Sequence, residues 1–300
     1  MKIKNISCAV VATAVLLAFS ACEPKENKGT APTVTDSVMF VGSAHAYCKA
    51  TITDNGSEKV TKYGFCYGTQ TLPTIENTKV EFTYEDFITD LSSLTPNTTY
   101  YLRSYATSSV GTSYGNEVTF TTLSRVKDNE GNEYSIRQFG DQIWIIDNLK
   151  TRHYNNNDTI ATTYPTNKDI RWETQQNYQW PCEGKESNVP AYGRLYTWFA
   201  ANDIRGIAPK GYHLPSKAEC EKLASIYLNN NYGKLSKFTP SGSRYGENYS
   251  GKNEGTVCWS SSLKTVNLAY SLYISIEENT ITVSEGSFNN GYTVFCVKDK

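Results

Sequence analysis

The chain has 300 residues, a formal net charge of −1 and an ordinary apolar fraction, enough for about two folded domains. Lysine and arginine are scattered and give no basic surplus, which argues against a nucleic-acid partner. Tyrosine is abundant and methionine rare, and with many Thr, Ser and Asn residues this favours strands, turns and an extracytoplasmic location.

Residues 1–21 have the pattern of a secretory signal peptide. Two lysines precede an apolar run from Cys8 to Phe19, which is too short to span a bilayer comfortably. Small residues then stand directly before Cys22, and this arrangement resembles a bacterial lipobox with Phe19 in place of the usual leucine. We therefore expect lipidation at Cys22 and an outer-membrane lipoprotein of the cell envelope, with the membrane as a partner. A signal without lipidation, or a short transmembrane anchor, is the alternative.

Residues 22–31 are polar and charged and contain proline and glycine, so they predict a flexible tether between lipid and first domain. Glu23 and Glu26 weakly resemble the surface-export signals of some Gram-negative anaerobes. Exposure on the cell surface is therefore one option for this protein.

Residues 32–123 predict a β-sandwich, because short alternating strands are separated by turn signals such as Asp54-Asn55-Gly56. The stretch from Leu94 to Tyr100 resembles the corner of a fibronectin type III domain. In that corner the tyrosine hydroxyl forms a hydrogen bond with the preceding turn, which implies a structural role for Tyr100. A buried strand tyrosine of any kind is the other interpretation.

A second domain is expected over residues 128–300, after a short polar join. Residues 128–132 predict a hairpin turn, because the distal glutamate of a calcium loop is absent. Trp144 lies in an apolar strand and is expected in the core. Residues 152–189 form a long polar and aromatic region, in which Trp172, Tyr178 and Trp180 are candidates for ligand contact. Packing of the same rings over the sheet is an equal alternative.

Residues 192–223 predict two helices around a turn bounded by glycine and proline. Tyr192, Leu195 and Phe199 recur at helical spacing and would form an apolar face from which Arg194 points away. Ser216 is placed to cap the second helix.

The motifs YGRLYTW, GYHLPSKAE and FCVKD, together with FGDQIWIIDNL and the Trp-Ser-Ser strand, resemble the Fibrobacter succinogenes major paralogous domain of bacterial surface and secreted proteins. The resemblance implies an α+β domain of C-type-lectin-like order, which is also similar in arrangement to formylglycine-generating enzymes. It implies structural roles for His213 and Pro215 within the second motif, and we expect His213 to be a buried, hydrogen-bonded group and not a catalytic base. Many family members carry a cysteine where this chain has Ala208, which leaves Cys258 as a substitute partner for Cys296.

The sequence predicts no catalytic residue, no metal site and no cofactor. The three histidines lack metal-ligand spacing, and no nucleophile or phosphate-binding motif occurs. The six cysteines beyond residue 22 fit disulfides or buried thiols equally well. We expect a multi-domain, non-enzymatic envelope protein: an all-β fibronectin type III-like sandwich followed by an α+β C-type-lectin-like domain that binds glycan or protein. A structural subunit of a surface assembly and a carbohydrate-active enzyme are the alternatives.

Overall fold

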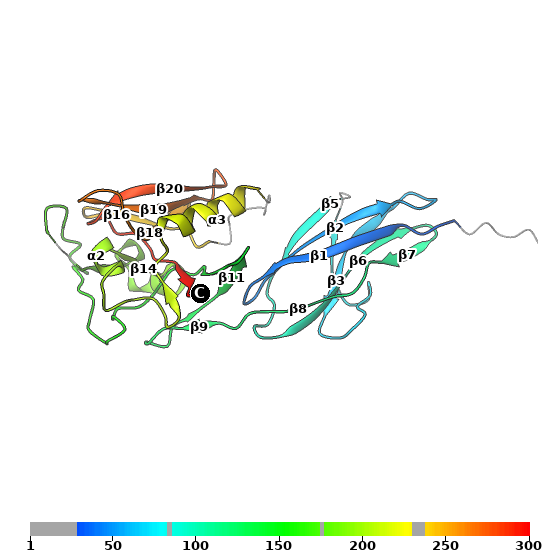
Figure 1. Cartoon of the computed structure of the whole chain (residues 1–300), viewed down its shortest axis with the longest axis horizontal. Helices are drawn as coiled ribbons and strands as arrows, with labels where there is room; N and C mark the ends of the chain where they lie inside the picture. The colour runs from blue at the N-terminus through cyan, green and yellow to red at the C-terminus, as the bar shows by residue number, and fades with distance from the viewer. Residues whose placement is uncertain (1–28, 83–85, 175–176, 230–237) are drawn as a thin grey trace, which may run out of the picture.

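A computed structural model describes residues 29–82, 86–174, 177–229 and 238–300, which form two domains arranged end to end (Figure 1). The expected signal peptide, Cys22 and most of the expected tether lie outside the described residues. In the described part of the chain, no helix is long and apolar enough to cross a membrane.

The first domain is a sandwich of two antiparallel sheets. One sheet has the order β1 (Thr33–Val41), β2 (Ala46–Asp54), β5 (Asp86–Leu91). The other has the order β4 (Thr78–Phe82), β3 (Lys62–Gly68), β6 (Thr99–Ser108), β7 (Gly111–Tyr114), with β8 (Val118–Thr121) also paired to β6. Apolar side chains from both sheets, among them Cys48, Phe65, Phe87 and Leu102, fill the space between them.

The predicted tyrosine corner is confirmed. Thr95 donates its backbone N–H to the Tyr100 hydroxyl at 3.0 Å, and the Tyr100 ring stacks on Phe120 with a centroid distance of 5.7 Å. Tyr100 thereby ties the turn before β6 to the core of the sandwich.

The second domain is built mainly from strands. A hairpin of β9 (Val126–Lys127) and β10 (Glu133–Tyr134) precedes a sheet of order β11 (Ile136–Phe139), β12 (Gln142–Ile145), β21 (Cys296–Lys298), β15 (Tyr212–His213). A larger sheet has the order β17 (Asn248–Lys252), β16 (Ser241–Tyr245), β18 (Gly255–Leu263), β19 (Leu268–Ser275), β20 (Thr280–Ser287). β13 (Gln179–Pro181) pairs with β14 (Arg194–Tyr196). The helices are α1 (Val189–Tyr192), α2 (Trp198–Ala201) and α3 (Lys217–Asn229), with 3₁₀ turns at Cys182–Gly184 and Glu186–Asn188.

The predicted helix over residues 192–200 is wrong. Gly193, at φ 68°, ends α1, and the next three residues form strand β14 before Thr197 caps α2 by accepting from Ala200 N–H. All three residues of β14 are buried, so the apolar pattern reflected burial on both faces of a strand. Arg194 is accordingly 3% exposed and pairs with Glu186, where a solvent-facing side chain was expected.

The second predicted helix is confirmed as α3, which packs against β18, β19 and β20 (Figure 1). Glu219 N–H donates to Ser216 Oγ at 3.3 Å, and Ser216 N–H donates to Glu219 Oε2 at 2.8 Å. These reciprocal bonds form a capping box.

The core of the second domain contains Trp144, as predicted. The expected hairpin turn is also confirmed, because Asp128 Oδ1 accepts from the backbone N–H of Glu130 and Asn132. The suggested Cys258–Cys296 disulfide is wrong, since both side chains are buried free thiols. Cys258 Sγ instead accepts from Phe295 N–H at 3.1 Å.

The two domains touch through the β1–β2 turn of the first and β11 of the second. Gly42 and Arg137 form an isolated antiparallel bridge. Ser43 N–H donates to Ile136 O at 2.8 Å, and Ile136 N–H donates to Ser43 Oγ at 3.0 Å. Hydrogen bonds of the kind found inside a domain therefore cross the boundary.

Candidate functional site

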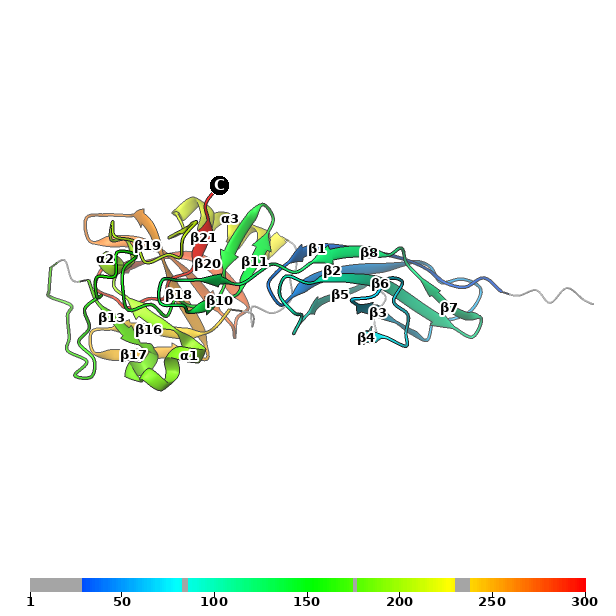
Figure 2. The same ribbon diagram turned by 90° about the horizontal axis from the view of Figure 1, so that it is seen from below.

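The loop of residues 163–173, called the distal loop here, reaches the end of the molecule farthest from the start of β1 (Figures 1 and 2). It carries Trp172, whose side chain is 88% exposed. The other four tryptophans of the chain are buried. A large amphipathic ring presented to solvent on a loop is a candidate contact for a ligand.

Two side chains from the body of the domain, Arg244 and Asn289, hold the distal loop in place. Arg244, on β16, is fully buried and donates from Nη2 to Lys168 O at 2.8 Å. Asn289 Nδ2 donates to Glu173 O at 2.8 Å and to Arg171 O at 3.3 Å. Both flanks of Trp172 are therefore fixed by backbone contacts, while its side chain projects freely.

Arg244 is a guanidinium enclosed by aromatic rings. It lies 4.0 Å from the ring centroid of Trp180 and 5.8 Å from that of Tyr249. Burial lowers the pKa of Arg244, because the charged form loses its hydration. Cation–π attraction to the two aromatic faces offsets part of this loss of hydration and stabilises the charged guanidinium.

A cation of the distal loop, Arg171, contacts a second exposed aromatic ring, Tyr245. Tyr245, at the end of β16, is 58% exposed, and the Arg171 guanidinium lies 5.4 Å from its ring centroid. Asp169 accepts hydrogen bonds from the guanidinium and the backbone N–H of Arg171, and these hold the pKa of Asp169 below its usual range. We call Arg171, Trp172 and Tyr245 the distal patch.

The three residues predicted to contact a ligand differ in their exposure to solvent. Trp172 is exposed as expected. Tyr178 is half-buried, with its hydroxyl 3.4 Å from Glu173 Oε2. Trp180 is fully buried and donates from Nε1 to Thr163 Oγ1 at 2.8 Å. Direct ligand contact by Trp180 is thus wrong, because its ring supports the loop from beneath through Arg244.

His213 is hydrogen-bonded, but the expectation that it is buried is wrong. Its side chain is 41% exposed and lies between two carboxylates, with Nδ1 2.8 Å from Asp299 and Nε2 3.0 Å from Glu219. Pro215 is buried, and its carbonyl accepts from Ser261 N–H at 2.8 Å. Both residues join the motif around α3 to neighbouring strands.

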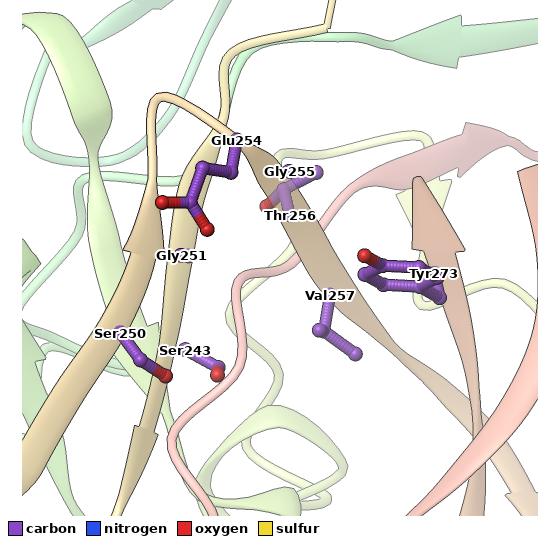
Figure 3. A pocket seen from close by; sticks show the side chains of 9 residues that line it. Ser243, Ser250, Gly251, Glu254, Gly255, Thr256, Val257 and Tyr273 are labelled. Atoms are coloured by element: carbon purple, nitrogen blue, oxygen red, sulfur yellow. The ribbon is translucent and has the colours of Figure 1, made fainter. Parts of the chain in front are cut away.

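Two hollows were not predicted. One, of about 370 Å³, lies beside His213 and is lined also by Tyr212, Asn155 and Asp203. The other, of about 230 Å³, lies between the β16–β17 hairpin and β18 (Figure 3). Three glycines line the second hollow, and their clustering in residues 242–255 is the signal that could have indicated it. No group of three or more His, Cys, Asp or Glu side chains in the described residues is placed to hold a metal ion.

Residues 138–233, about a third of the chain, match the sequence model of the family described as Fibrobacter succinogenes major domain. The match runs from β11 through α3, which includes the YGRLYTW and GYHLPSKAE motifs and the distal loop. With the sandwich described above, the chain combines a fibronectin type III-like domain with a Fibrobacter succinogenes major domain. This combination suggests a protein of the surface or adhesion type.

Among solved structures, the chain is similar to the sixth fibronectin type III domain of human fibronectin type III domain containing protein 3, at 22% identity and a TM-score of 0.22. That alignment covers 32% of this chain and 84% of the human domain. Another fibronectin type III domain of the same human protein aligns at 18% identity and a TM-score of 0.24, covering 32% and 87%. No curated protein matches the chain.

Proposed function

We propose that this chain is a lipid-anchored, non-enzymatic protein of the bacterial cell envelope that binds a glycan or a surface protein through the distal patch. The observation that carries the proposal is Trp172, exposed on a loop that Arg244 and Asn289 fix from both sides. A fixed loop loses little conformational entropy on binding, so an exposed aromatic ring on it contributes most of its burial energy to affinity. Tryptophan, tyrosine and arginine are also the residues enriched at energetically dominant contacts.

The placement of the patch supports an adhesive role. The described chain begins at one end of the molecule, and the distal loop lies at the other (Figures 1 and 2). A protein tethered through its N-terminus would thus hold the patch away from the membrane. The first domain serves as a spacer in this arrangement, and a C-type-lectin-like order of the second domain belongs to the same proposal.

The three histidines are all paired with carboxylates. Each imidazole lies at ion-pair distance from a carboxylate: His45 from Asp90, His153 from Glu130, and His213 from Glu219 and Asp299.

The test uses residues 23–300 as a soluble protein, with Trp172→Ala and a matched variant, Val266→Ala. Val266 is also 88% exposed, and it belongs to the turn between β18 and β19, outside the distal loop. The parent protein and both variants are applied to glycan arrays and to intact cell-surface protein extracts. Trp172→Ala should weaken the binding found for the parent protein by about 1–3 kcal/mol, while Val266→Ala leaves it unchanged. Equal binding by all three proteins would refute the distal patch as the contact surface.

A further inference from the structure

The outer face of the large sheet contains a second site, separate from the distal patch. It forms where the β16–β17 hairpin parts from β18, since the two share only the register pair Gly242 and Thr256. The strands diverge beyond that pair and leave a groove of about 230 Å³ (Figure 3).

Glycines give the groove a floor of bare backbone. A Cβ on Gly242, at φ 68°, would lie 2.1 Å from Ser250 O. A Cβ on Gly255 would lie 2.5 Å from Ile274 O. Close backbone packing therefore requires glycine at both positions, and the part of the groove that they line is bare backbone.

The walls combine one aromatic ring with hydroxyl groups and one carboxylate. Tyr273, on β19, is 38% exposed, and its hydroxyl end points into the groove beside Val257 (Figure 3). Ser243 and Ser250 stand opposite each other in the β16–β17 register. Glu254 is exposed at the rim, and among the described residues it is the only charged one that lines the groove.

We propose that this groove binds one neutral pyranose unit of a saccharide. A pyranose presents a face of C–H groups, which suits the Tyr273 ring, and a rim of hydroxyl donors, which suits the Glu254 carboxylate. Ser243 and Ser250 supply further donors and acceptors on the opposite wall. The volume lies below the range of pockets for drug-sized ligands, which fits a single ring. The negative charge of Glu254 disfavours acidic sugars, because a uronate would bring two carboxylates together.

The site can be tested by amide NMR titration of residues 23–300 with the methyl glycosides of glucose, galactose and mannose, and with glucuronate. At least one neutral glycoside should shift the Gly242, Gly251 and Gly255 amides saturably, with a dissociation constant on the order of millimolar for so open a groove. Glucuronate should bind more weakly than methyl glucoside. No saturable shift with any neutral glycoside, or tighter binding of glucuronate, would overturn the proposal.

Substitutions in the groove test whether the glycoside binds there. Glu254→Gln and Tyr273→Ala should each lower the affinity for the neutral glycoside by about tenfold. The first variant loses a charged hydrogen-bond acceptor, and the second loses the aromatic ring. Tyr273→Phe keeps the ring and should retain most of the affinity. Glu277→Gln, which changes another exposed carboxylate near β19, should leave the titration unchanged. Unaltered affinity in both Glu254→Gln and a folded Tyr273→Ala would rule the groove out, whatever the distal patch binds.

Discussion

The guanidinium of Arg137, in the second domain, lies 3.0 Å from the carboxylate of Asp90, in the first, and the two side chains are only 5% and 10% exposed. His45 Nδ1 approaches the other oxygen of Asp90 at 3.3 Å. An ion pair buried between domains leaves an uncompensated charge when one partner is removed. Arg137→Met should therefore reduce the free energy of unfolding by about 3–5 kcal/mol.

Urea denaturation of Arg137→Met and of a control, Lys62→Met, checks this expectation. Lys62 pairs with Glu81 on the surface, where both side chains are well exposed, so its loss should change stability by about 1 kcal/mol or less. A similar small effect for both variants would show that the interface contributes little.

The tyrosine corner gives a second prediction. Tyr100→Phe removes the acceptor of the Thr95 N–H and should lower stability by about 1–3 kcal/mol. Tyr101→Phe, at the neighbouring position on β6 with its side chain half-buried, is the control and should be nearly neutral. Thermal melts of the two variants are compared, and equal midpoints would contradict the corner's role.

The two tryptophans of the loop region should behave oppositely. Trp180→Ala empties a fully buried site under Arg244 and should cost about 3–5 kcal/mol of stability. Trp172→Ala should leave the melting temperature close to that of the parent, because its ring has few contacts to lose. A large fall in melting temperature for Trp172→Ala would mean that the ring is packed in solution.

Glu130 should make the second domain sensitive to acid. Burial by itself raises its pKa, but hydrogen bonds from Thr151, Arg152 and His153 outweigh burial, so the pKa lies below its ordinary value. The ionised carboxylate thus stabilises the fold above the unfolded pKa of about 4.3, and this contribution is lost as pH falls through the lower folded value. Glu130→Gln should flatten the fall in stability between neutral and acid pH, while Glu277→Gln should not. Parallel pH profiles for Glu130→Gln and the parent would refute this.

The proposed attachment to the membrane depends on lipidation of Cys22. Cys22→Ser should yield an unprocessed or soluble chain, because acyl chains are the stable attachment that the sequence predicts. Membrane fractionation and intact mass report the outcome. Unchanged fractionation together with unchanged mass would exclude lipidation at this cysteine.

The sequence predicted features that depend on local chemistry. The Tyr100 corner, the Ser216 cap and the turn at Asp128 each rest on a few neighbouring residues with strong backbone preferences. Strand β14 was mistaken for helix because burial on every side removes the periodicity that separates the two. The anchoring of Trp172 depends on Arg244 and Asn289, which are far away along the chain, and no local pattern encodes such contacts.

The six described cysteines are all buried free thiols, and burial raises the pKa of Cys66 and Cys182 to about 11. While the chain is folded, its thiols are therefore shielded from oxidants. Unfolding would release all six at once, and in an oxidising compartment they would couple to one another in non-native pairs. Unfolding would then tend to be irreversible, so the rate of unfolding would determine how long the protein stays functional.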